Sequence, residues 1–347
     1  MEYHKRVSEA LLSRVVDDLE TEFPARKVRA EAGTPSTLAG LIWRVSALHQ
    51  LGLALLSILV FGAGVVPLEL QRRVVNEAAT RGSAETILTL VVFYLAVAAA
   101  LGLLKLGLNV SRSYVSENAV RWLRAALLED LCCLRPEYHT AVNRGIEVSL
   151  VLDEAEPIGG FVGVSLSEPL LQSGILVAVF GYMVYLQPFM AVIAAAVFSP
   201  QVIFVPLMQR AINRRVVSRI GMLRAISGGI IAEPDAGASK GSAQSKRIQD
   251  VFALNMGVMR LKFSMNFLMN LMHHLGVAAI LGVGGYQVVK GEMEVGSVVA
   301  FLSGLGQIND PWGDLVTWFR DLRVTQAKYA LISRAVNRLR GGLPGGR

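Results

Sequence analysis

Six apolar segments, each long enough to cross a membrane as a helix, occupy much of this 347-residue sequence. A helix needs about 20 apolar residues to cross a hydrocarbon core about 30 Å thick. Lipid offers the backbone no hydrogen-bond partners, and a helix satisfies its own polar groups. We therefore predict an all-α polytopic membrane protein with six transmembrane helices and long cytosolic extensions. The segments are Ala47–Leu70, Thr86–Leu108, Ile158–Leu186, Phe189–Met208, Asn266–Val289 and Val295–Phe319.

The composition supports a membrane protein. Hydrophobic residues make up 53% of the chain and charged residues 18%, whereas soluble domains carry about 25% charged residues. Residues 1–30 are charged along their length. We therefore expect no cleavable signal peptide here, and we expect the first span to direct membrane insertion.

The formal net charge of +7 could indicate a nucleic-acid partner, but basic residues in a membrane protein mark its cytosolic side. The densest group of arginines directly follows the fourth span: Arg210, Arg214, Arg215 and Arg219. Three arginines on the opposite side weaken the pattern: Arg72, Arg73 and Arg81. We expect contact with the lipid bilayer, no nucleic-acid partner, and both termini on the cytosolic side of the plasma (inner) membrane.

The connections between spans alternate in length. Short turns join spans three and four and spans five and six, whereas much longer segments separate spans two and three and spans four and five. Apolar residues recur at helical spacing in residues 109–134 and 211–231. This periodicity predicts that membrane helices continue well past the bilayer, and that a helix resumes at Ala243 after the second long connection.

We divide the chain into a cytosolic N-terminal segment (residues 1–37), a transmembrane domain (residues 38–336) and a C-terminal tail (residues 337–347). The apolar stretch from Leu38 ends on Trp43 and Arg44. This composition suits a helix that lies in the membrane interface before the first span.

The two cysteines, Cys132 and Cys133, are adjacent in a predicted cytosolic helix. Adjacent cysteines rarely bridge each other, and the cytosol is reducing. No nearby Cys or His completes a set of metal ligands at a usual spacing. We therefore expect neither a disulfide nor a metal site.

Several short sequences occur in an order and spacing typical of one family. They are RWLRAALLEDL (121–131), RPEY (135–138), NRG (143–145) and KGEMEVGSVVAF (290–301), with Pro67, Pro311 and the Ala-containing stretch Ala327–Arg334 at matching places. From these sequences, residues 37–336 resemble the six-helix, domain-swapped transmembrane domain of ABC exporters.

The resemblance implies a nucleotide-binding ATPase and a second transmembrane half. No G-x-x-x-x-G-K-[ST] sequence, which would cradle phosphates, occurs in the 347 residues. We therefore expect this chain to hold no cofactor, and ATP with magnesium to bind a separate ATPase subunit. A homodimer is the default assembly because symmetric pairs are the commonest. ISGGI (226–230) and LSGLGQ (302–307) resemble the ABC signature sequence, but both lie on predicted membrane helices or their extensions. We therefore expect their glycines to allow close helix packing and not to contact ATP.

In such exporters, two cytosolic turns dock on the ATPase. In the first turn of this chain, Pro136 ends a helix and Tyr138 offers an aromatic anchor; a solvated turn is the alternative. The second turn departs from the family, because little beyond Glu233 remains of the expected acidic and hydrophobic stretch. The candidate coupling residues are Pro136, Glu137, Tyr138, Arg144, Glu233 and Asp235.

Polar residues inside a span are costly in lipid and usually face a cavity or another helix. Asn266, Asn270 and His273 share one helix face through their i, i+4, i+7 spacing. For Lys105 and Glu168 the alternative is mutual neutralisation, and for the asparagines it is hydrogen bonding between helices. The candidate pathway residues are Lys105, Glu168, Gln201, Asn266, Asn270, His273, Gln307, Asn309 and Asp310.

Two kinds of function remain open at this point. The chain is expected to be the permease subunit of an ABC-type exporter, which forms the substrate pathway and couples to a separately encoded ATPase. The alternative is a proton-coupled carrier that uses Glu168, Asp310 or His273, or a degenerate membrane scaffold on the same fold. We expect no enzymatic activity in the chain itself, because its Ser, His and Asp residues show no nucleophile arrangement.

Overall fold

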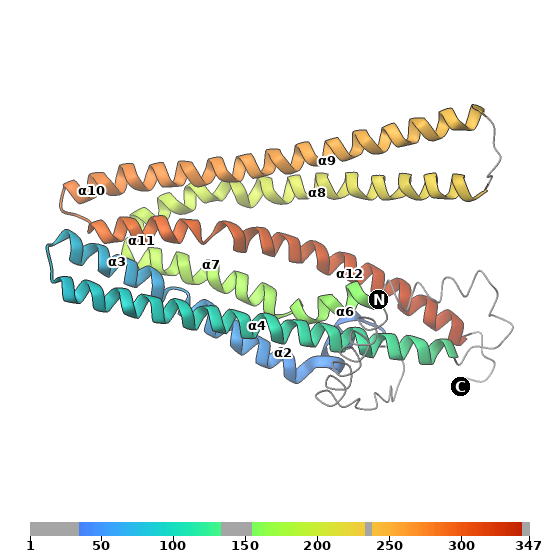
Figure 1. Ribbon diagram of the computed structural model, residues 1–347, viewed down its shortest axis with the longest axis horizontal. Coiled ribbons are helices and arrows are strands. Elements are labelled where there is room, and N and C mark those ends of the chain that lie inside the picture. Colours follow the sequence, from blue (N-terminus) through green and yellow to red (C-terminus); the bar gives the residue numbers. More distant parts are fainter. Residues whose placement is uncertain (1–34, 133–154, 233–237, 342–347) are drawn as a thin grey trace, which may run out of the picture. The chain divides into compact units, whose positions relative to one another are not determined.

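The structure, a computed structural model, describes residues 35–132, 155–232 and 238–341, and every regular element within them is a helix (Figure 1). The all-α prediction is confirmed. In chain order the helices are α2 (Leu38–Ala63), α3 (Val66–Ala79), α4 (Ala84–Cys132), α6 (Ala155–Val164), α7 (Ser167–Leu186), α8 (Pro188–Ala232), α9 (Ala238–Ala279), a π-helical turn (Ile280–Gly284), α10 (Gly285–Val289), α11 (Val295–Gly306) and α12 (Asn309–Gly341).

Three of the six expected spans consist of two helices each, and a proline lies just after every break. Pro67, Pro169 and Pro311 lie two or three residues inside α3, α7 and α12. Proline has no N–H to donate, and its ring clashes with the carbonyl four residues earlier. That earlier residue is the last of α2 or lies in the break before α7 or α12. The prolines therefore fit the interruptions of these spans, although α8 continues as one helix through Pro200 and Pro206.

The sixth expected span is not one continuous helix. α11 has 12 residues, which gives about 18 Å at 1.5 Å per residue, and a hydrocarbon core is about 30 Å thick. Five helical segments in the described part of the chain are long and apolar enough to cross a membrane, and residues 295–319 are not among them. The predicted sixth segment is therefore two helices, because the chain leaves the helix at Gln307 and Ile308.

The long extensions are confirmed. α4 continues through residue 132 as one helix of 49 residues, and α8 continues through residue 232 as one helix of 45 residues. α9 starts at Ala238, five residues before the predicted restart at Ala243. The segment that begins at Leu38 is helical, and its helix has a kink at Ser46 before the first span.

The described residues form two compact units. One comprises the described parts of Met1–His49, Arg112–Val164 and Leu322–Arg347, and the other comprises Gln50–Ser111 and the described part of Ser165–Asp321. We call them the terminal unit and the span unit.

The span unit has an apolar core built from α3, α7, α8, the π-helical turn and α11. Phe198 of α8 contacts Phe180 of α7 and Trp312 of α12 edge to face, with ring centroids 5.9 and 6.2 Å apart. The buried core residues are Leu68, Val179, Met183, Met190, Ala191, Ala194, Phe198, Ile280, Val298, Phe301, Leu305 and Ile308.

In the terminal unit, α6 packs directly onto the backbone of α4. A methyl group at Gly159 would lie 2.6 Å from the backbone nitrogen of Val120, and one at Gly163 would overlap the carbonyl oxygen of Arg112. The hydroxyl of Ser116 donates to the carbonyl of Gly160 at 3.0 Å. Glycines four residues apart thus allow close approach of two helices, as in small-x-x-x-small packing.

The terminal unit also buries Tyr329 of α12, whose hydroxyl donates to the backbone carbonyl of Pro35. Tyr329→Phe should lower the free energy of unfolding by about 1 kcal/mol, because the hydrogen bond is lost. Burial raises the pKa of Tyr329 to about 12 from its ordinary value of 10.0.

The pH dependence gives this prediction a sign. The contribution of the Tyr329 hydroxyl to the free energy of unfolding is complete below pH 10. It is lost as the pH rises toward 12, because the tyrosine of the unfolded chain ionises at a lower pH than that of the folded protein. The melting temperature of the wild type should therefore fall relative to that of Tyr329→Phe over this range. A gap that stays constant to pH 12 would contradict the assignment.

Candidate functional site

A hydrogen-bonded contact joins α7 and α12 in the described part of the span unit. The side-chain amide of Gln172 donates to Oε1 of Glu168 at 2.8 Å and to Oδ2 of Asp314 at 2.9 Å. Gln172 is buried, and both hydrogens of its amide nitrogen are used in these bonds. The amide therefore holds carboxylates from two helices close together.

The chemistry of this site is that of an anionic, hydrogen-bond-accepting patch. Asp310 lies one helical turn before Asp314 on α12, so the two share a helix face. A charged side chain inside a membrane protein is costly, and it is kept mainly where it has a functional or pairing role. The group thus consists of carboxylate acceptors from two helices and one bridging amide.

The structure brings together part of the predicted pathway set. Glu168 and Asp310 belong to the region of this contact, whereas Gln172 and Asp314 were missed by the sequence analysis. Both could have been found from spacing, since Gln172 lies four residues after Glu168 and Asp314 lies four after Asp310.

The remaining pathway candidates are distributed over other helices. Gln201 of α8 is 2% exposed, and among the described residues its Oε1 has no hydrogen-bond partner. His273 of α9 lies against His274 with ring centroids 5.6 Å apart. The other candidates lie on α4, on α9, or at the break before α12 and its first residue: Lys105, Asn266, Asn270, Gln307 and Asn309.

The predicted coupling residues cannot be placed in this geometry. Pro136, Glu137, Tyr138, Arg144, Glu233 and Asp235 all lie outside the described residues. Their role stays a prediction.

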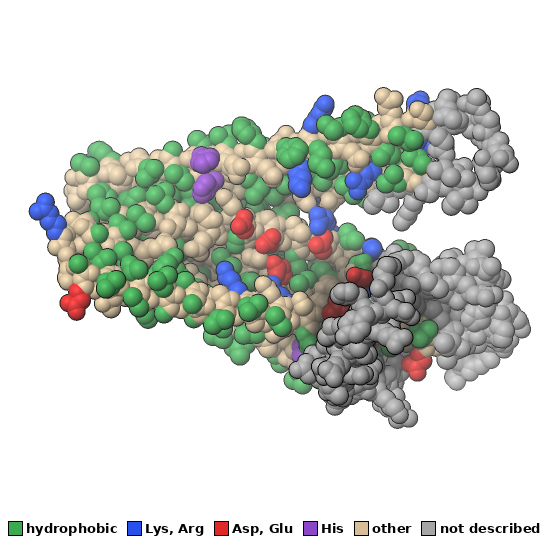
Figure 2. Space-filling view, viewed as in Figure 1, with side chains coloured by type: hydrophobic (Ala, Val, Ile, Leu, Met, Phe, Trp, Pro, Cys, Tyr) green, Lys and Arg blue, Asp and Glu red, His purple; other side chains and the backbone are tan. Residues whose placement is uncertain are grey.

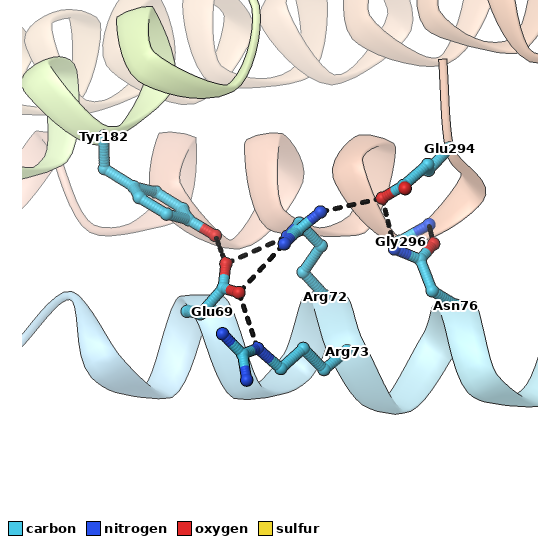
Figure 3. A network of polar contacts seen from close by, with 7 residues as sticks. All are labelled: Glu69, Arg72, Arg73, Asn76, Tyr182, Glu294 and Gly296. Atoms are coloured by element: carbon cyan, nitrogen blue, oxygen red, sulfur yellow. Dashed lines mark hydrogen bonds and ion pairs between the residues drawn. The ribbon is translucent and has the colours of Figure 1, made fainter.

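A second polar group ties α3 to α7 and α11 (Figure 3). Glu69 of α3 accepts two hydrogen bonds from Arg72, at 2.9 Å each, and one from Arg73 at 2.7 Å. The hydroxyl of Tyr182 on α7 donates to Glu69 at 2.7 Å. We refer to Glu69, Arg72, Arg73, Asn76, Tyr182 and Glu294 as the α3 network.

The α3 network also caps α11. Arg72 pairs with Glu294 at 2.7 Å, and Asn76 of α3 accepts a hydrogen bond at 2.7 Å from the backbone N–H of Gly296. The first N–H groups of a helix lack partners within the helix, and a side-chain oxygen normally supplies one. Here the cap comes from a helix more than 200 residues away in sequence.

The α3 network was not among the residues predicted from the sequence. Arg72 and Arg73 had stood out only as basic residues on the unexpected side of the membrane. Their carboxylate partner, Glu69, lies three and four residues before them, and this is the spacing at which side chains meet on a helix. That spacing was the available signal.

These features define the class of protein. Apolar helices long enough to span a bilayer describe an integral membrane protein. Residues 50–218 match the family model of the ABC transporter transmembrane region. No curated protein matches the chain. The resemblance seen in the sequence is confirmed.

Proposed function

We propose that this chain is the permease subunit of an ABC-type exporter, in which it forms the substrate pathway and couples to a separately encoded ATPase. The observation that carries the proposal is the match of residues 50–218 to the ABC transporter transmembrane region. In this proposal the separate ATPase supplies ATP hydrolysis, since the 347 residues contain no phosphate-cradling loop of their own. The contact between Glu168, Gln172 and Asp314 is the proposed polar part of the pathway.

A second transmembrane half completes the proposed unit, by default a second copy of this chain. Native mass spectrometry of the purified protein tests this assembly. A species that transports as a monomer would contradict it.

The protein is proposed to lie in the plasma (inner) membrane, with both termini in the cytosol. A cysteine introduced at Glu292 should be labelled from outside, and one at Ser239 from inside only. The opposite labelling pattern would reverse the topology.

The test of function is transport into sealed vesicles that contain this chain with and without a candidate ATPase. Transport should require both the ATPase and ATP, and the chain alone should not hydrolyse ATP. Transport that follows a proton gradient in vesicles without any ATPase would favour the alternative, a proton-coupled carrier.

The same assay tests the pathway contact. Gln172→Leu removes two hydrogen bonds to carboxylates, each contributing about 1.5–3 kcal/mol, and should reduce transport at least about tenfold. Ser173→Ala is the matched control, because this hydroxyl is exposed and bonds only to backbone carbonyls of its own helix. Equal transport by the Gln172 variant and the control would remove this contact from the pathway.

A further inference from the structure

The antiparallel pair formed by α8 and α9 has a defined register. Arg215 of α8 donates to the backbone carbonyl of Gly257 on α9 at 2.7 Å, and Arg219 donates to Oδ1 of Asn255 at 3.1 Å. These two arginines hold the pair together. Because both helices rise about 1.5 Å per residue, the register places Arg214 level with Arg260, and Arg210 level with Lys262.

These cations lie where two long uncharged stretches end. Residues 188–209 of α8 and residues 263–289 of α9 and α10 contain no Asp, Glu, Lys or Arg. Each stretch is long enough to cross a hydrocarbon core about 30 Å thick. Arg210 and Lys262 are the first charged residues beyond these stretches, so both helices leave the apolar layer at the same level.

The exposed side chains are apolar on one side of this level and basic on the other. On the apolar side, Leu207 is 55% exposed and Phe267 is 65% exposed, as expected for groups that face lipid. On the other side, Arg210, Arg214, Arg260 and Lys262 are all exposed. We call these four residues the basic band.

The band has no acidic residues beside it on its own helices. Residues 210–219 and 251–262 contain no Asp or Glu, and Asp250 is the nearest acid on α9. Figure 2 shows Lys and Arg side chains spaced along the part of the α8–α9 pair that extends away from α10. Four exposed cations thus lie at one level beside an apolar surface, and this is the depth at which phospholipid headgroups lie.

We propose that the basic band binds the headgroups of anionic phospholipids in the leaflet where α8 and α9 leave the membrane. A guanidinium group matches a phosphate with two parallel hydrogen bonds, and Lys adds a point charge. Each basic residue close to an anionic membrane surface strengthens the attraction about fivefold. The band therefore distinguishes anionic from zwitterionic lipids, and does so independently of the substrate and of ATP.

The experiment is native mass spectrometry of the purified protein titrated separately with phosphatidylglycerol and phosphatidylcholine. The wild type should bind phosphatidylglycerol more tightly. The double variant Arg214→Gln/Arg260→Gln should weaken phosphatidylglycerol binding more than tenfold and leave phosphatidylcholine binding unchanged. Added salt should reduce the wild-type preference in the same direction, because it screens exposed charges.

The matched control is Lys246→Gln/Arg247→Gln, which removes the same charge from α9 about 21 Å further along the helix. This control should keep the wild-type lipid preference. An equal loss in the control, or no preference in the wild type, would overturn the proposal. If the double variant does not fold, Arg214→Gln and Arg260→Gln are tested singly, each with an expected loss of about fivefold.

Discussion

Replacing Gly163 by alanine is expected to lower the free energy of unfolding by about 3 kcal/mol, the upper end of the usual cost of overpacking. The added methyl group would overlap the carbonyl oxygen of Arg112 and the hydroxyl of Ser116. A backbone carbonyl inside α4 cannot move aside without breaking the helix, so α6 has to shift as a whole. The melting temperature of the purified protein in detergent is the measurement.

Gly160→Ala provides the control for this prediction. Gly160 is on the same helix, and a methyl group there meets no atom within 4 Å. Alanine is also the better helix former, so this variant should be as stable as the wild type or slightly more stable. If both alanine variants melt at the same temperature, close packing of α6 on α4 is not what Gly163 provides.

Glu69→Gln is expected to cost about 2–3 kcal/mol, because hydrogen bonds to a charged group contribute about 1.5–3 kcal/mol. The change keeps the shape of the side chain but removes the negative charge that Arg72, Arg73 and Tyr182 share. Faster hydrogen exchange should appear at the start of α11 as well, because Arg72 reaches Glu294 beside the first turn of that helix.

The control for Glu69 is Glu292→Gln, an exposed glutamate in the turn before α11, which should leave stability unchanged. A double-mutant cycle between Glu69→Gln and Tyr182→Phe should give a non-zero interaction energy, since the two side chains touch. Additive effects would show that the contact from α7 contributes nothing to the network.

Much of the architecture could be read from the sequence because its causes are local. An uncharged run of about 20 residues is long enough to span a bilayer wherever it lies in the chain. Helical periodicity in residues 109–134 and 211–231 correctly predicted that α4 and α8 continue past the apolar layer. The breaks before Pro169 and Pro311 are compatible with local chemistry, because proline disfavours continuation of the preceding helix.

The candidate site was only partly predictable. The cost of charge in lipid was enough to select Glu168 and Asp310 from the sequence. The same cost does not apply to the uncharged Gln172. Its spacing from Glu168 was a signal, but its bond to Asp314, 142 residues away, is visible only in the structure. Asn266, Asn270 and His273 were equally good pathway candidates by spacing. They lie on α9, whereas the contact of Gln172 joins α7 and α12.

The sequence by itself determined that the chain is helical, lies in a membrane and follows the ABC exporter pattern, since each conclusion depends on composition or on neighbours within one or two helical turns. The tertiary structure alone decided which side chains complete one another. Asn76 of α3 caps α11, and Tyr182 of α7 donates a hydrogen bond to Glu69 of α3. Gly163 allows α6 to pack closely against α4. Such pairings join residues far apart in the chain, and local periodicity carries no information about which helix faces meet.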